Sequence, residues 1–549
     1  MKGTLSAMST VALPIPDLLS ADARMRISTA ALRQALVFAF AAGAPQAAFD
    51  DVVGAADLPA SSWERDGFVR DVYVDEIVDK CLALRVGAEG YRASGRYAAR
   101  VLAAPPHDAR HVEIRQSVLA ELVDVPAARS ELESVYLSIL RIRGLLCAPR
   151  QPAPRVRRVE ILRAVRGAFE LLAQSFAGAT SALSRLRAFG VAVADSDGYR
   201  RLVAFLEHDE HLGSLDLRVR VGADGEVRAL QIVRVEENRS NPFYVPALRR
   251  FFARIVLFGR GFRTTAGEIA ERLLSEVFAG VEGSIAPLFQ LLGDIEVVLG
   301  ALCFRDRARA LGLSVTLATL TAPDSALDLQ GLFNPLLLAA GVQPVPCDLH
   351  AGPNAIVVVT GPNSGGKTRL LQSVAIAQLL SQVGLFVPAR GARVPLASGL
   401  FASLFEEARS DQPEGHLGME LLRIRRLFDE FDPGALVVLD ELCSGTNPSE
   451  GEEIARLVLS LLPELGVRAF ATTHLLQFAA GLAREAKNGS IPLEFIQVEL
   501  DGSERATYRF VPGVARTSLA QKTASRLGVT REELLAKIAA KRSRRAGQS

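Results

Sequence analysis

The sequence predicts an α region followed by an α/β domain: helices that carry a small inserted β-hairpin, then a domain built on a largely parallel sheet. Three observations predict this fold class. The chain has 549 residues, too many for one compact core. Apolar residues recur at helical spacing in the first part of the chain. Apolar runs alternate with amphipathic segments in the second part, which is typical of α/β folds.

The composition is that of a folded protein. Hydrophobic residues make up 49% and charged residues 23%, which excludes the polar, highly charged class of disordered chains. The longest apolar run, 35–44, ends at Pro45 and spans about half of what a membrane-crossing helix needs. We therefore expect a buried helix segment there and no membrane association. The N-terminus shows no export signal, so cytoplasmic residence is expected.

Charge and cysteine usage narrow the partners further. The formal net charge is +2, so nucleic-acid binding would have to depend on local basic patches. The cysteines are far apart, without a CxxC or Cys/His cluster that could hold a metal, and are expected to be small buried hydrophobes. They are Cys81, Cys147, Cys303, Cys347 and Cys443.

Helical periodicity runs from about residue 105 to 190. The residues that form the apolar stripes are Leu132, Val135, Ile139, Ile142, Leu162, Val165, Phe169, Leu172 and Phe176. Helix resumes after Thr265, which has capping-box spacing to Glu268, and is expected to end near residue 315.

Within the helical region the period changes to two. Leu215, Leu217, Val219 and Val221 alternate with polar residues, and an Asp-Gly pair at 224–225 marks a turn. We expect a β-hairpin within residues 213–240. A second hairpin is expected around 501–502, at the end of the α/β part.

One loop motif carries the clearest chemistry. It consists of Gly361, Pro362, Asn363, Ser364, Gly365, Gly366, Lys367 and Thr368, which fit G-x-x-x-x-G-K-[ST]. An apolar run precedes the motif and an amphipathic segment follows it, as a strand-loop-helix phosphate site requires. Glycines let backbone N–H groups surround phosphate oxygens. We expect Lys367 to meet the β- and γ-phosphates of ATP, and Thr368 to meet Mg²⁺.

Two further strand ends supply polar side chains. The run ALVVLD ends at Asp440 and is followed by Glu441, at the edge where ligands bind in parallel sheets. Asp440 is expected to hold Mg²⁺ through water, and Glu441 to orient or deprotonate the attacking water. The next apolar run ends in Thr472, Thr473 and His474, which should reach the same edge.

These residues resemble the MutS family of DNA mismatch repair ATPases. That family's loop reads TGPN-x-GGK-[ST], matched at 360–368, and its VGxxVPA stretch is matched at 383–389. Its DE-x-x-x-GT strand end is matched by Asp440, Glu441, Gly445 and Thr446, and its Thr-His by Thr473 and His474. The resemblance implies an ABC-type P-loop ATPase with catalytic Glu441 and His474, and a homodimer whose nucleotide sites are shared between subunits.

The resemblance covers about 345–535, and upstream it depends on architecture alone. It implies a disordered start at 1–20, a helical core and lever at 21–320 with a reduced clamp hairpin at 213–240, an ATPase domain at 321–540 and a basic tail at 541–549. Three departures are visible. We see no mismatch-reading N-terminal domain and no nuclease tail. Residues 415–420 stand where the family has a Ser-Thr-Phe loop. The clamp is reduced to one hairpin.

The expected function is a DNA-binding, MutS-like ATPase in mismatch repair or related DNA processing, with double-stranded or structured DNA as partner. The arginines that could contact phosphates are Arg218, Arg220, Arg228, Arg234, Arg239, Arg249, Arg250 and Arg254. They could equally form a solvated face or pair with Glu236 and Glu237. Two alternatives remain open: action on ribosomes, RNA or another protein, and a regulatory protein that hydrolyses ATP poorly.

Overall fold

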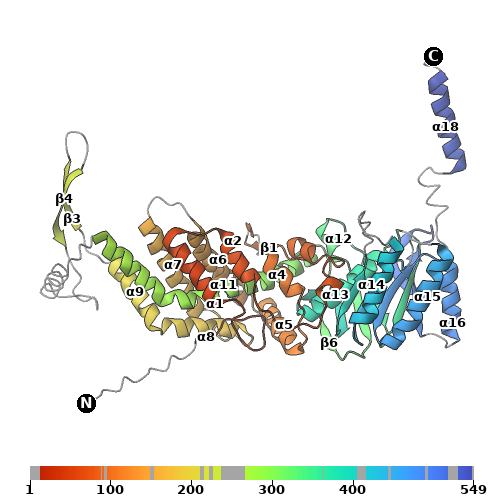
Figure 1. Cartoon of the computed structure of the whole chain (residues 1–549), viewed down its shortest axis with the longest axis horizontal. Coiled ribbons are helices and arrows are strands. Elements are labelled where there is room, and N and C mark those ends of the chain that lie inside the picture. The colour runs from red at the N-terminus through yellow and green to blue at the C-terminus, as the bar shows by residue number, and fades with distance from the viewer. Residues whose placement is uncertain are drawn as a thin grey trace. The chain divides into compact units, whose positions relative to one another are not determined.

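The computed structural model describes residues 13–87, 89–91, 95–148, 154–210, 215–221, 227–235, 266–362, 364–404, 416–442, 447–488, 492–516 and 530–546. Backbone contacts divide the chain into two compact units (Figure 1). The first unit comprises Met1–Asp57 and Ser117–Val298, and the second comprises Leu58–Gln116 and Leu299–Ser549. The division falls within two helices, α5 (Ala109–Asp124) and α11 (Ala266–Ala310). The α with α/β fold class predicted from the sequence is confirmed.

Among its described residues, the first unit is helical apart from one hairpin. Besides parts of α5 and α11 it contains α1 (Thr29–Ala42), α2 (Gln46–Gly54), α6 (Pro126–Cys147), α7 (Pro154–Gln174), α8 (Leu183–Ala194) and α9 (Asp197–Glu210). All nine apolar residues of the predicted stripes are buried. Ring stacking connects the N-terminal helices to α11, with centroids of Phe40 and Phe278 4.0 Å apart and those of Phe49 and Phe289 4.8 Å apart.

The segment just before α1 belongs to this core, contrary to the expectation that residues 1–20 are disordered. Leu18 and Leu19 have no exposed surface. The fully buried guanidinium of Arg26 lies between the carboxylates of Asp17 and Asp294, at 3.1 and 2.5 Å. Sequence composition gave no sign of this, because Asp294, which pairs with Arg26, lies 268 residues further along the chain. Residues 1–12 lie outside the described part of the chain.

The predicted hairpin is present as β3 (Leu215–Val221) and β4 (Val227–Val235), paired antiparallel. Arg218, Arg220, Arg228 and Arg234 lie on these strands. Arg239, Arg249, Arg250 and Arg254 lie outside the described residues. The described part of helix α11 starts at Ala266, and Thr265, the predicted cap, lies outside the described residues. Its stretch Leu274–Ala310 is long and apolar enough to cross a membrane, but the most hydropathic window of that stretch is completely buried in the protein.

The second unit is organised around a six-stranded sheet of order β12-β13-β14-β9-β15-β16. Its strands are β9 (Ile356–Thr360), β12 (Leu400–Ser403), β13 (Leu436–Leu439), β14 (Arg468–Thr473), β15 (Leu493–Leu500) and β16 (Ala506–Pro512). All neighbours are parallel except β15 and β16, which form the predicted hairpin. Three of these strands, β9, β13 and β14, lead into the sequence motifs, and their C-terminal ends are therefore adjacent at one edge of the sheet.

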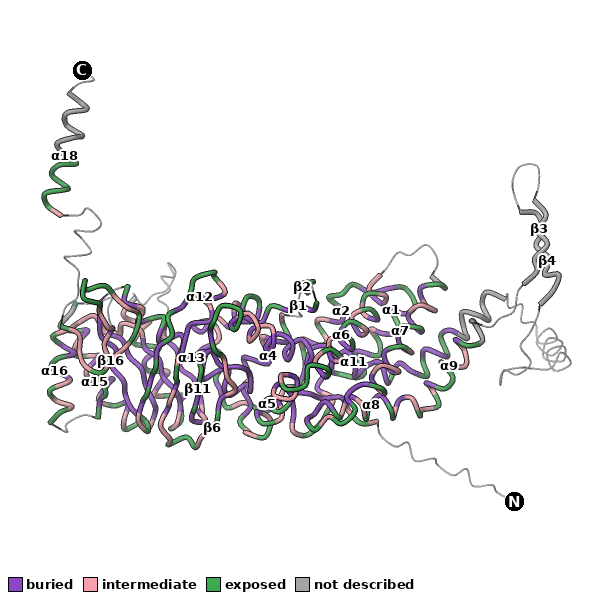
Figure 2. Tube along the Cα trace, turned by 180° about the vertical axis from the view of Figure 1, so that it is seen from behind, coloured by how far each residue is buried: buried purple, intermediate pink, exposed green. Residues whose placement is uncertain are grey.

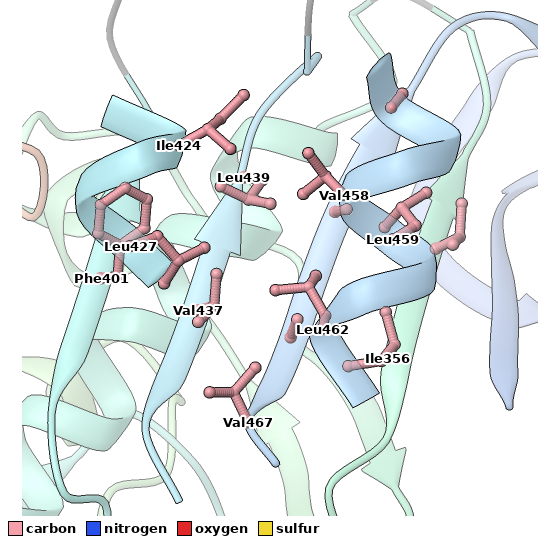
Figure 3. Packing of buried hydrophobic residues seen from close by; sticks show 14 of the residues in the cluster. Ile356, Phe401, Ile424, Leu427, Val437, Leu439, Val458, Leu459, Leu462 and Val467 are labelled. Carbon is pink, nitrogen blue, oxygen red and sulfur yellow. The ribbon is translucent and has the colours of Figure 1, made fainter. Parts of the chain in front are cut away.

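Helices cover both faces of this sheet. On one face, α14 (His416–Glu430), α15 (Pro448–Leu465) and α16 (Leu476–Lys487) pack against alternate strand residues, including Val437 and Leu439. Figure 3 shows Leu427 and Leu462 pointing from α14 and α15 toward these strands. Helix α13 (Lys367–Val383) contacts β13 and β14 from the other face. It is buried along nearly its whole length, as its colour in Figure 2 shows, so the phosphate loop leads into the protein interior.

Smaller elements complete the second unit, and the sequence had not predicted them. A four-stranded sheet has the order β6-β11-β7-β8, formed by β6 (Thr319–Thr321), β7 (Leu327–Leu332), β8 (Cys347–Ala351) and β11 (Gly391–Pro395). Short pairs join β1 (Leu84–Val86) to β2 (Glu89–Tyr91), and β5 (Thr316–Leu317) to β10 (Phe386–Val387). The short helices are η1 (Arg65–Gly67), α3 (Val74–Glu76), the π-turn η2 (Ile77–Cys81), α4 (Gly95–Leu102) and α12 (Pro335–Ala339), with α18 (Arg531–Ala546) near the C-terminus.

Residues 58–116 pack with the second unit, whereas the sequence-based boundaries placed 21–320 together as one helical region. Arg115 shows the attachment: its side chain is almost fully buried and donates to Val383 O at the end of α13, at 2.8 Å. Trp63 donates through Nε1 to Ala397 O at 3.1 Å. These contacts join parts of the chain separated by more than 250 residues, which local patterns do not reveal.

Candidate active site

The phosphate loop connects the end of β9 to the start of α13. Gly361 has φ of 146° and Gly366 has φ of 88°, and at both positions a Cβ would meet neighbouring side chains. Gly366 is the N-cap of α13, so the loop ends on a helix N-terminus, where the helix dipole favours an anion. Glycine at these two positions thus serves both the turn and the close approach of the Val498 and Tyr508 side chains. Asn363 lies outside the described residues.

Lys367 is held inside the loop. Its side chain is 4% exposed, and Nζ donates to Gly361 O at 3.1 Å and to Pro362 O at 3.2 Å. Burial lowers the pKa of Lys367, while the carboxylates of Glu441 and Asp440 partly oppose the shift. A buried cation in this position has a strong electrostatic preference for an entering anion.

The three strand ends meet around Asp440, as the sequence predicted. Thr368 Oγ1 donates to Asp440 Oδ2 at 2.5 Å, and Thr472 Oγ1 donates to Asp440 Oδ1 at 2.5 Å. The Glu441 N–H donates to Thr472 Oγ1 at 2.8 Å. Both oxygens of the carboxylate are therefore fixed, one by the first turn of α13 and one by β14. Thr472 was noted in the sequence only as the start of a polar strand end, and its bridging role was missed.

Glu441 stands between Lys367 and His474. Its Oε1 lies 3.9 Å from Lys367 Nζ and its Oε2 lies 3.6 Å from His474 Nδ1. The second distance exceeds a hydrogen bond, and within the described part of the chain His474 Nδ1 has no hydrogen-bond partner. The backbone of Glu441 also has φ of 49°, which is unusual for a residue other than glycine. Backbone conformations of this kind are concentrated at functional sites.

A pocket of 640 Å³ opens beside these groups, a volume typical of small-molecule sites. One part of its wall is charged and polar, with Lys367, Thr368 and Glu441. Another part is apolar or aromatic and includes Leu337, Val342, Val345, Cys347, Tyr508 and Phe510. Lys367, Thr368 and Glu441 form the polar end of the pocket. A wall with both polar and apolar residues can hold a phosphorylated nucleoside.

The donor set at the polar end also fits a divalent cation. Thr368 and Asp440 present a hydroxyl and a carboxylate side by side, and hard oxygen ligands are what Mg²⁺ prefers. Among the residues that the structure describes, no group of three or more His, Cys, Asp or Glu could hold a metal by itself. A site of this kind therefore relies on the phosphates of its ligand for the remaining coordination.

Comparison with known proteins agrees with this geometry. Residues 357–540 match the family described as MutS domain V. Endonuclease MutS2 of Streptococcus equi subsp. equi is 32% identical over 243 residues, which is 44% of this chain and 29% of that protein. Endonuclease MutS2 of Pelotomaculum thermopropionicum is 32% identical over 271 residues, or 48% of this chain and 32% of that protein.

These matches support the assignment of the chain to the MutS family. Residues 357–540 match a MutS-type ATPase domain, a class of domain that binds nucleotide. The match to Endonuclease MutS2 of Streptococcus agalactiae serotype Ia is 35% identical over 240 residues and covers 42% of this chain. The chain spans about a third or less of the length of these curated relatives, at 29–32%.

Proposed function

We propose that this MutS-family chain binds ATP in the pocket beside Lys367 and hydrolyses it with Glu441 as the water-orienting base. The observation that carries the proposal is the placement of Glu441 between Lys367 and His474, at the polar end of the pocket. Lys367 and the N-terminus of α13 would hold the phosphates. Glu441 would orient or deprotonate the attacking water, and His474 would position Glu441 or the γ-phosphate.

Thr368 and Asp440 are the residues that would hold Mg²⁺. When bound, the ion neutralises phosphate charge that develops as the terminal phosphoryl group leaves. The chain's own contribution is to fix Asp440 by two hydroxyl donors, so that its carboxylate does not have to reorganise during turnover.

The test of hydrolysis is Glu441→Gln, which keeps the shape of the side chain and removes its basicity. ATP binding should remain within a few-fold of wild type, measured with a fluorescent ATP analogue, while phosphate release falls at least 100-fold. Unchanged turnover would refute the role of Glu441. A wild-type chain that binds ATP without measurable turnover would support the regulatory, poorly hydrolysing alternative instead.

We further propose that ATP turnover changes the grip of this chain on DNA, with helices α6–α9 and α11 as lever and hairpin β3–β4 as a reduced clamp. The support is the MutS-type ATPase domain together with four arginines on the two hairpin strands. Phosphate contacts of this kind give sequence-independent affinity that falls with salt. Filter binding of duplex and branched DNA between 50 and 300 mM salt would test it, and weak, flat binding at low salt would overturn it.

The active form is proposed to be a homodimer through the ATPase domain, with the start of α15 reaching the partner's nucleotide. Asn447 caps that helix by accepting from the Ser449 N–H at 3.2 Å, and Ser449 and Glu450 are exposed. Light scattering of the Glu441→Gln variant should show a dimer with ATP. A monomer under these conditions would exclude the shared site.

Action on ribosomes, RNA or another protein is the competing reading. The two hypotheses are distinguished by which ligand stimulates ATP turnover. Stimulation by duplex or branched DNA supports the DNA reading, whereas stimulation by ribosomes or structured RNA with no response to DNA supports the other.

A further inference from the structure

A strap formed by residues 62–81 crosses the ATPase unit and passes the nucleotide pocket. At one end Ser62 Oγ donates to Ser398 O at 2.7 Å, and the buried indole of Trp63 donates to Ala397 O. At the other end Cys81 Sγ approaches Pro335 O at 3.5 Å, at the start of α12. The strap is therefore held at both of its ends by contacts within the same unit.

The middle of the strap is fixed by Asp71. Its carboxylate is 2% exposed and lies 2.7 Å from Arg423 Nη2 of helix α14. Burial raises the pKa of Asp71, while Arg423, Arg70 and the backbone of Leu404, a residue that lines the pocket, oppose the shift. Arg423 Nη1 lies 3.4 Å from Ser403 Oγ, and the main-chain oxygen of Ser403 accepts from the Asp440 N–H at 2.9 Å. Asp71 thus contacts α14 directly and, through Arg423, the end of β12, which lies next to the strand that carries Asp440.

Two residues further on, Tyr73 lines the pocket together with Arg369, Leu404 and Glu441. Its backbone is left-handed, with φ of 60° and ψ of 52°, which is unfavourable for an aromatic residue and which asparagine or glycine would adopt more easily. Burial raises the pKa of Tyr73, with the Arg369 charge partly opposing it, so the phenol stays protonated. An energetically unfavourable backbone thus places a phenol in the wall of the pocket.

We propose that Tyr73 contacts the bound nucleotide and that the strap couples occupancy of the pocket to helix α14 through Asp71 and Arg423. This inference relies on the proposed nucleotide site and adds to it a positioning residue from a segment about 290 residues upstream of the phosphate loop. Arg423 lies on helix α14, so a change at Tyr73 would reach that helix through the Asp71–Arg423 pair.

The chain contains its own probe, because Trp63 is the only tryptophan and lies on the strap, edge-on to Phe68 with centroids 5.2 Å apart. Wild-type full-length chain would be titrated with ATPγS and Mg²⁺, with binding measured by equilibrium dialysis and Trp63 emission measured in parallel. Tyr73→Asn truncates the side chain while suiting the left-handed backbone. Tyr91→Asn is the matched control, since Tyr91 lies in the same unit outside the pocket and pairs with Glu89.

We expect Tyr73→Asn to raise the Kd for ATPγS at least 10-fold, with Tyr91→Asn within twofold of wild type. Saturating nucleotide should change Trp63 emission in wild type. The double variant Asp71→Asn, Arg423→Gln replaces the ion pair by a neutral pair, and should bind nucleotide yet lose at least half of that emission change. If Tyr73→Asn does not fold, Tyr73→Phe should raise the Kd at least threefold.

Two failures are distinguishable. Absence of nucleotide binding in wild type overturns the proposed function and this inference with it. Normal binding overturns the inference alone if the Kd of the Tyr73 variant equals that of wild type, if Trp63 emission does not respond, or if the double variant responds fully.

Discussion

Thr472 and Asp440 are joined by a hydrogen bond of 2.5 Å between Oγ1 and Oδ1, and the same hydroxyl accepts the Glu441 N–H at 2.8 Å. One buried side chain on β14 therefore orients both acidic residues of the site. This arrangement explains why the strand end carries threonine. A hydroxyl can donate to a carboxylate and accept from an amide at the same time, which valine of similar shape cannot do.

Thr472→Val should therefore damage catalysis more than folding. We expect kcat to fall about 10- to 100-fold, since loss of one orienting hydrogen bond in an active site commonly has this effect. Stability should fall by about 1–3 kcal/mol, because the Glu441 amide loses its partner. Steady-state ATPase kinetics and urea unfolding measure the two effects. Thr316→Val is the control, as that hydroxyl bonds only to Leu317 O. Normal kcat in Thr472→Val would show that Asp440 needs no such orientation.

Lys367→Met should separate nucleotide affinity from stability. We expect the Kd for ATP to rise at least 100-fold, about 2.7 kcal/mol. The melting temperature of the free protein should stay the same or rise, because burial of this cation is costly before a phosphate arrives and Glu441 Oε1, 3.9 Å away, offsets only part of that cost. The exposed Lys487 serves as control in Lys487→Met. A large drop in melting temperature would indicate that Lys367 is mainly structural.

The lowered pKa of Lys367 adds a pH dependence with a definite sign. The charged form that phosphate requires is lost as pH rises through the lowered value, so ATP affinity should decline at a pH below the 10.5 of an ordinary lysine. Kd measured from pH 7 to 10 tests this. Affinity that is constant across the whole range would contradict it.

The active-site edge could be predicted from sequence because its parts are local. Gly361 to Thr368 follow a buried strand directly, and Asp440 and Glu441 follow another. Each motif therefore marks the end of the strand that precedes it. Parallel strands then bring those ends together. The core residues of the helical region could be predicted as well, since apolar residues such as Leu132 and Ile139 recur at helical spacing.

What the sequence did not reveal depends on contacts between distant segments. Tyr73 and Arg115 come from a stretch with no motif, and they meet the ATPase unit only after folding. The burial of Leu18 depends on the pairing of Arg26 with Asp294, which no local pattern encodes. Composition alone therefore assigned the N-terminal segment to disorder.

Arg26 allows a test of that N-terminal core. It is fully buried between two carboxylates, so Arg26→Met should leave both uncompensated and cost about 3–5 kcal/mol. Arg24→Met is the matched control, because the Arg24 and Asp57 side chains are 46% and 82% exposed, and such pairs contribute little. Hydrogen exchange of residues 17–27 and urea unfolding of the full chain measure the effect. Equal stability of the two variants would show that the buried cluster does not hold the segment.

Two glycines on α7 and α8 are predicted to change the stability of the protein in opposite directions when each is replaced by alanine. A Cβ on Gly190 would lie 2.5 Å from Ala173 N and 2.7 Å from Leu172 Cβ, so Gly190→Ala must push the helices apart. We expect a loss of about 1–3 kcal/mol, as for overpacked cores. Gly167 is exposed on α7 with no atom within 4 Å of such a Cβ, and Gly167→Ala should gain about 0.5–1 kcal/mol from helix propensity. Thermal unfolding of the full chain should therefore move in opposite directions for the two variants. If both variants are more stable than wild type, the close approach of α7 and α8 does not exist in solution.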